Sequence, residues 1–123
     1  MKVETKTLKE SLELLTSIIH LDNLKPITSF LQVCARDNKL YMGMSNNITK
    51  VAYSIDCTED LPTIVLDAQQ LLKLTKLTTK KDIVITYNSG IVEIKGNGKY
   101  KQAVQADESG DALKLDIKFP TIS

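Results

Sequence analysis

The feature that most constrains the fold is an order of elements that occurs twice along the chain. In each copy a short strand leads into an amphipathic helix, and three strands separated by polar turns follow. The first copy covers about residues 1–58 and the second about residues 62–106. The expected elements are strand 2–6, helix 7–21 and strands 27–34, 40–44 and 48–57, then strand 63–66, helix 67–77 and strands 83–87, 91–95 and 100–105. We therefore predict an α+β domain of two β-α-β-β-β units, with the sheets on one side and both helices on the other.

Both helices begin with residues whose side chains can accept backbone hydrogen bonds. Thr7 followed by Glu10 matches a Thr-x-x-Glu capping box. Asp67 followed by Gln70 has the same spacing, so Asp67 can accept a backbone hydrogen bond at the helix start and Gln70 can reach back. A stripe of apolar residues at helical spacing is expected to face the core, namely Leu8, Leu12, Leu15 and Ile19. Strict alternation predicts one buried face for the strand at 48–57, formed by Val51, Tyr53, Ile55 and Cys57.

Composition and charge limit the kinds of partner. The 123 residues are enough for one domain with a hydrophobic core. The 16 basic and 15 acidic residues give a net charge of +1, so contact with a nucleic acid requires local segregation of charge. No apolar run approaches the roughly 20 residues that cross a bilayer, and residues 1–6 contain no apolar signal core. We therefore expect a cytoplasmic protein.

The sequence offers no constellation of residues that indicates catalysis or metal binding. Cys34 and Cys57 lie in apolar, strand-like segments, and we interpret them as buried free thiols. His20 is the only histidine, so we predict no metal site and no cofactor. Residues 96–99 have the glycines but not the spacing of a phosphate-binding loop, which indicates a hairpin turn. We predict that the chain is not an enzyme.

The helix at 67–77 carries the candidate functional surface. At about 100° per residue, one stripe has positive charge and no negative charge, and it comprises Gln69, Lys73, Lys76 and Lys80. Such a face suits phosphates, although an ordinary solvated face with lysines favoured by the helix dipole is the alternative interpretation. The outward residues of the first helix sum to −1, so we expect an uneven DNA-facing surface; they are Lys9, Glu10, Glu13, Ser17 and His20.

At three places the residues resemble the first domain of the bacterial sliding clamp, the processivity subunit of the replicative DNA polymerase. The segment 67–77, the Pro26-Ile27 strand opening and the terminal Phe119-Pro120 carry this resemblance. The resemblance implies a ring in which two chains of three such domains encircle duplex DNA, with the helices lining the hole and the sheets outside. It also implies a replicative polymerase and a clamp loader as partners, and it places the polymerase-binding pocket in domains that this chain does not contain.

Within the second helix the match is partial. Members of the family typically have Asp-Ala, two basic residues, two large apolar residues and an arginine near the helix end. Asp67-Ala68 and Leu71-Leu72 match, Lys76 stands where the arginine is usual, and Gln69-Gln70 replaces the basic pair. In the loop four residues before the strand-opening proline, Asp22 stands where an arginine is frequent.

The expected DNA contacts follow from the basic stripe and from the resemblance together. Lys73 occupies a position that is commonly acidic in the family, so it partly replaces the charge that the two glutamines remove. Lys25 lies near Asp22 without occupying the matching position. The candidate DNA-binding residues are Lys76, Lys73, Lys80, Gln69 and Lys25.

We expect a single clamp-like domain at residues 1–118, with a solvated loop at 107–111. Residues 119–123 are expected to begin a linker to a further domain. The alternative function is a protein-interaction module with the same fold that does not encircle DNA. It is motivated by the near-neutral charge and by Asp22, Gln69 and Gln70 at positions that are usually basic.

Overall fold

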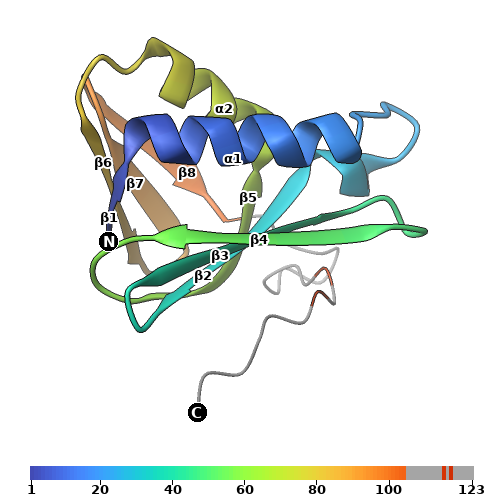
Figure 1. Ribbon diagram of the computed structural model, residues 1–123, viewed down its shortest axis with the longest axis horizontal. Coiled ribbons are helices and arrows are strands. Elements are labelled where there is room, and N and C mark those ends of the chain that lie inside the picture. Colours follow the sequence, from blue (N-terminus) through green and yellow to red (C-terminus); the bar gives the residue numbers. More distant parts are fainter. Residues whose placement is uncertain (105–114, 116, 118–123) are drawn as a thin grey trace.

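The computed structural model describes residues 1–104, 115 and 117, which form two helices and two four-stranded antiparallel sheets (Figure 1). The first half contains β1 (Lys2–Glu4), α1 (Thr5–Ile18), the 3-10 helix η1 (Pro26–Ser29), β2 (Phe30–Arg36), β3 (Lys39–Ser45) and β4 (Lys50–Asp56). The second half contains β5 (Leu61–Asp67), α2 (Ala68–Leu77), β6 (Asp82–Asn88), β7 (Ile91–Lys95) and β8 (Lys99–Ala103). The predicted α+β class and the repeated order of elements are confirmed. The predicted loop at 107–111 and linker at 119–123 lie outside the described residues.

Each sheet combines strands from both halves of the chain. One sheet has the order β1-β6-β7-β8 and the other has the order β4-β3-β2-β5. The first strand of each half therefore leaves its own unit and pairs antiparallel with the second strand of the other unit. The registers place Val3 opposite Ile83 and Leu31 opposite Leu66, so buried residues meet buried residues across both exchanged pairs. Neither half can complete its sheet without the other.

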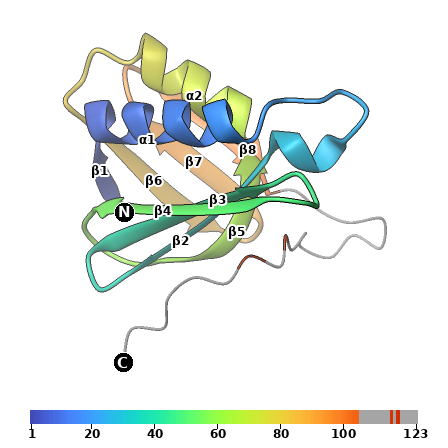
Figure 2. The ribbon, with the colours of Figure 1, turned by 45° about the vertical axis from the view of Figure 1, so that its right-hand side comes forward.

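The two helices pack against each other on one side of both sheets, and they run in opposite directions (Figures 1 and 2). The predicted core stripe of α1 is confirmed, because Leu8, Leu12, Leu15 and Ile19 are 0 % exposed. Helix α2 buries Ala68, Leu71, Leu72 and Thr75. Burying large apolar side chains is the main favourable contribution to folding, so these stripes hold the helices on the sheets.

Helix α1 begins earlier than the sequence predicted. Its first residue is Thr5, whose backbone N–H donates to the carbonyl oxygen of Lys81 at 2.8 Å. The predicted capping box at Thr7 is wrong, because the Thr7 hydroxyl donates to Glu4 Oε1 at 2.7 Å inside the first turn. A long-range contact with the second half of the chain thus sets the start of α1. The helix ends at Ile18, before the predicted residue 21, because the backbone of Ile19 is extended.

The predicted strand at 27–34 begins later than expected. Residues 26–29 form η1, and the strand starts at Phe30. Pro26 has no N–H to contribute to a sheet and favours the first turn of a helix. The buried hydroxyl of Thr28 donates to the Lys25 carbonyl oxygen at 2.7 Å and accepts from the Asp22 N–H at 2.8 Å, which fixes this turn.

The prediction of a buried face on strand β4 is only partly correct. Ile55 and Cys57 are buried, whereas Val51 is half-buried and Tyr53 is 44 % exposed. This strand lies at a sheet edge, so it has a neighbouring strand on one side only. Cys34 and Cys57 are buried free thiols as predicted, and burial raises the pKa of the Cys57 thiol.

The predicted cap of α2 is confirmed. Comparing the removal of this cap with the removal of the Thr7 hydroxyl tests both helix starts. Asp67 Oδ1 accepts from the Gln70 N–H at 3.0 Å. We expect Asp67→Ala to lower the free energy of unfolding by about 1 kcal/mol, because the helix start loses its acceptor. Thr7→Ala should stay within about 0.5 kcal/mol of the parent, because its hydroxyl does not cap the helix. Urea unfolding measures both values, and equal losses would contradict the assigned start of α1.

Candidate nucleic-acid interface

Helix α2 presents two of the predicted lysines to solvent. Its buried stripe faces the sheets, and this leaves Lys73 and Lys76 exposed on the opposite face. Lys76 lies in the last turn, where a cation also interacts favourably with the helix dipole. The sequence therefore predicted the orientation of these two side chains correctly.

The other two members of the predicted stripe lie differently. Helix α2 ends at Leu77, so Lys80 belongs to the loop before β6 and the stripe does not extend to it. Gln69 is half-buried in the first turn. Gln70 does not reach back to complete a capping box, because its side-chain oxygen accepts from the Gln102 amide of β8.

Lys25 lies apart from the other candidates. It contributes to a shallow groove at the far end of α1, together with His20, Asp22 and Thr28. Asp22 stabilises this loop locally, since its carboxylate accepts from the Leu24 N–H at 2.9 Å. The predicted DNA-binding residues thus do not form one surface.

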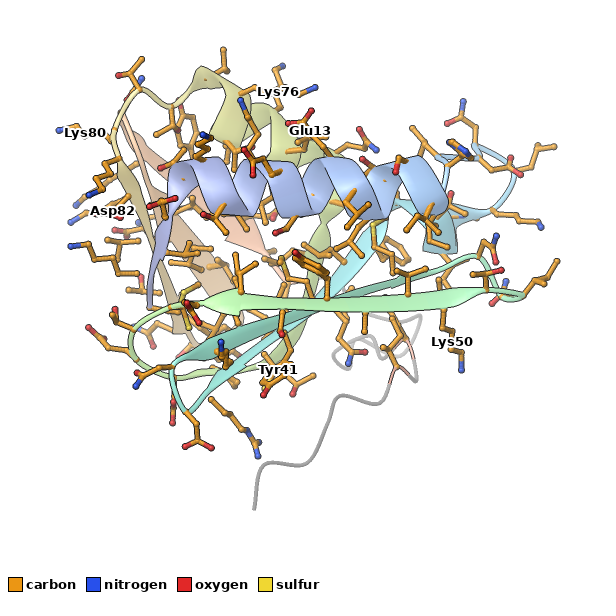
Figure 3. The ribbon with its side chains drawn as sticks, in the orientation of Figure 1. Glu13, Tyr41, Lys50, Lys76, Lys80 and Asp82 are labelled. Carbon is orange, nitrogen blue, oxygen red and sulfur yellow. The ribbon has the colours of Figure 1, made fainter. Side chains whose placement is uncertain are left out.

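A second groove brings together cations from three segments. It lies between the start of α1 and the end of α2, which adjoin because the helices are antiparallel (Figure 1). Its volume is about 400 Å³. We call it the basic groove; the lysines that line it are Lys6, Lys9, Lys76, Lys80 and Lys81, and Glu4 is the one acidic residue among the described side chains that line it. Figure 3 shows Lys76 on the helix side and Lys80 where α2 leads into β6.

None of the groove lysines forms an ion pair with a carboxylate among the described residues. Such pairs are formed by Lys2, Lys39 and Lys99. Glu10 and Glu13 are exposed further along α1, where they reduce the positive charge of the helix layer. Positive charge is therefore concentrated at the end of the layer where α1 begins and α2 ends.

The loop that carries Lys80 and Lys81 is held by the hairpin between β7 and β8. The Asn97 side chain accepts from the Thr79 N–H at 2.9 Å and donates to the Leu77 carbonyl oxygen at 2.9 Å. Gly96 permits this approach, because a Cβ atom there would lie 2.6 Å from the Thr78 hydroxyl oxygen. The prediction of a hairpin turn at 96–99 is confirmed, and the turn also supports the C-terminal end of α2.

The sequence interpretation missed Lys6 and Lys9 as members of a cationic site. The sequence pattern predicts Lys6 in a strand and puts Lys9 on a face of the first helix with a net negative charge. Their proximity to Lys80 and Lys81 follows from the pairing of β1 with β6. A helix start placed directly after Glu4 would have put Lys6 and Lys9 on the same helix. Only the long-range pairing of β1 with β6 shows that Lys80 and Lys81 lie beside them.

The described residues contain no group of three or more histidine, cysteine, aspartate or glutamate side chains placed to hold a metal ion. Within the same part of the chain, no helix has the length and hydrophobicity needed to cross a membrane.

Comparison with known proteins identifies the fold. By sequence, no protein-family model and no curated protein matches the chain. By structure, the chain is similar to the Helicobacter pylori beta clamp bound to a DNA ligase peptide, with a TM-score of 0.77 and 17% identity over 99% of this chain and 33% of that one. It is also similar to DNA polymerase III subunit beta of Borrelia burgdorferi, with a TM-score of 0.73 and 21% identity over 96% of this chain and 35% of that one. Caulobacter crescentus pol III beta gives a TM-score of 0.73 and 18% identity over 99% of this chain and 31% of that one.

The chain therefore has the fold of one domain of a bacterial beta clamp. It spans about a third of the length of the clamp chains that it matches.

Replacing Asn97 tests whether the hairpin positions the groove lysines, because this change leaves every lysine in place. We expect Asn97→Ala to lower the free energy of unfolding by about 1 kcal/mol through the lost hydrogen bonds. It should also weaken binding to duplex DNA, because the loop that carries Lys80 and Lys81 loses its support. Asn23→Ala is the control, since the Asn23 side chain forms no hydrogen bond among the described residues. Denaturation and fluorescence anisotropy measure the two effects, and a neutral Asn97→Ala variant would contradict this role.

Proposed function

We propose that the chain acts as one domain of a DNA polymerase processivity factor, a ring that encircles duplex DNA and tethers a replicative polymerase. The observation that carries this proposal is the basic groove on the helix side of a clamp-domain fold. In the family that the chain resembles, the helices are expected to line the hole of such a ring. This side of the domain carries lysines that have no carboxylate partner among the described residues.

The distribution of charge supports a sliding contact with DNA. Attraction between lysines and phosphates does not depend on base sequence. It weakens as the salt concentration rises, because releasing counterions from the DNA then gains less free energy. Lys73 adds a further exposed cation on α2 beside the groove lysine Lys76. Stacking on unpaired bases needs aromatic side chains gathered on one face, whereas the exposed Tyr53 and Tyr100 lie on β4 and β8, which belong to different sheets. Duplex DNA is thus the favoured nucleic acid.

The sheet edges support assembly with further domains. Strands β4 and β8 end their sheets, and no described strand pairs with their outer edges. Such an edge presents unpaired N–H and carbonyl groups that can continue a sheet into another domain. Tyr53 and Tyr100 are 44 % and 41 % exposed on these two strands, so apolar surface accompanies the open backbone groups. In the proposed ring, the β4 edge of one domain joins the β8 edge of the next.

A protein-interaction module with the same fold is the second candidate function. It is favoured by the placement of Gln70, whose side chain is engaged with Gln102 and is not presented to a DNA strand. Asp22 likewise serves its own loop. In this alternative, the lysines of α2 are a solvated surface stabilised by the helix dipole, and DNA is not a partner.

Charge reversal distinguishes the two functions. We expect Lys76→Glu combined with Lys80→Glu to weaken binding of a short duplex at low salt by at least about tenfold. The slope of log affinity against log salt should fall by about two, because two phosphate contacts are lost. Arg36→Glu is the control for each of the two single reversals, since Arg36 is an exposed cation at the β2–β3 hairpin, away from the helices. If the parent chain binds no duplex, or if all variants bind it equally, the DNA function is wrong.

A further inference from the structure

Two loops beyond the end of α1 each present a highly exposed aliphatic side chain. Leu24, in the loop between α1 and η1, is 91 % exposed, and Ile48, at the tip of the β3–β4 hairpin, is 85 % exposed. They are the two most exposed large apolar side chains in the described part of the chain. Both loops lie at the same end of the molecule (Figures 1 and 2), and both contribute residues to the groove that contains Lys25. The two side chains therefore belong to one surface, whereas isolated exposed apolar residues are common and carry no meaning.

In each loop a side-chain oxygen fixes the backbone of the exposed aliphatic residue. Asp22 Oδ1 accepts from the Leu24 N–H at 2.9 Å, and Asn46 Oδ1 accepts from the Ile48 N–H at 3.0 Å. Turns in which an aspartate or asparagine side chain accepts the backbone N–H two residues on hold a loop in one conformation. Leu24 and Ile48 are thus presented on an ordered backbone, which reduces the entropy that is lost when a partner binds them.

The groove beside these loops has an apolar wall on the helix side. We call it the loop groove; Ile18 and Leu21, from the end of α1, line it and are 43 % and 50 % exposed. Its volume is about 550 Å³. Leu24 and Ile48 belong to the two loops that contribute to its lining. A concave surface with several aliphatic side chains at and beside it is suited to hold apolar side chains of another protein.

The charges at the loop groove favour an acidic partner. Lys25 is an exposed cation that lines it, and Asp22 is the one acidic residue among the described residues that do so. The Asp22 carboxylate is engaged within its own loop, because it accepts the Leu24 N–H. Figure 3 shows a further cation at this end of the molecule, Lys50, where the hairpin leads into β4. Carboxylates beside the apolar residues of a partner would meet complementary charge here.

We propose that the loop groove binds a short peptide segment of another protein, one that carries apolar side chains next to acidic ones. The apolar side chains pack against Ile18 and Leu21 and are flanked by Leu24 and Ile48, and Lys25 attracts the acidic side chains. This surface goes beyond the proposed function and does not depend on it, because the basic groove lies at the other end of α1.

The test selects peptides of about twelve residues from a random displayed library on the 123-residue chain. The selected peptides should combine apolar residues with a net negative charge, and their addition should shift the amide NMR signals of residues 20–25 and 46–49. Leu24→Ser and Ile48→Ser should each weaken the tightest peptide at least about fivefold, because an anchoring apolar contact is lost. Leu77→Ser is the control for each, since it removes a leucine that is 58 % exposed at the end of α2.

Lys25→Glu tests the charge contribution separately. It should weaken acidic peptides, and the loss should shrink as salt screens the exposed charges. Thermal unfolding checks the fold of every variant, and the melting temperatures should match that of the parent because the replaced side chains are exposed.

Three results would overturn the peptide site. The first is a selection that enriches no acidic, apolar peptide, or peptides that bind Leu24→Ser and Ile48→Ser like the parent. The second is Leu24-dependent binding to vesicles of phosphatidylcholine and phosphatidylglycerol without peptide binding, which would indicate a membrane contact. The third is Leu24-dependent dimerisation that excludes the peptides, which would indicate a second copy of this chain. Duplex binding measured on the same variants should be unchanged, so the failure of either function leaves the other standing.

Discussion

The exchange of first strands between the two halves is the interaction on which the rest of this structure depends. Pairing of β1 with β6 brings the start of α1 to the chain segment that follows α2, where the Thr5 N–H meets the Lys81 carbonyl oxygen. The corresponding pairing of β5 with β2 places α2 antiparallel to α1 on the same side of the sheets. The basic groove is a direct consequence, because it contains residues from both sides of the exchanged junction.

Local patterns in the sequence were sufficient to predict the order of the main helices and strands, and long-range pairing was needed for the start of α1 and for the site. Helical spacing identified the core stripe of α1, and Asp67 identified the start of α2, because both signals lie within a few residues. The start of α1 was misplaced because a contact with Lys81 determines it. For the same reason, Lys76 and Lys80 were predicted as candidates while Lys6 and Lys9 were missed. Lys25 was selected by proximity in sequence to a family position, and it lies in another groove.

A net charge of +1 is compatible with DNA binding when charge is distributed in this way. Two of the carboxylates pair with lysines that do not line the groove, since Asp82 pairs with Lys2 and Asp56 with Lys39 (Figure 3 labels Asp82). The groove lysines remain available for an external anion. A ring built from such domains would attract phosphates at a limited number of points on its inner wall, and these contacts would hold no particular sequence.

Retention of the natural full-length protein on DNA of different topology tests the central claim most directly. The protein is assembled on nicked circular duplex at low salt and then transferred to about 1 M salt, where charge contacts are screened over roughly 3 Å. Encirclement predicts that the protein stays on the circle at high salt and dissociates once the circle is cut at a single site. Loss from the intact circle at high salt, or equal retention before and after cutting, would contradict a ring that encloses DNA.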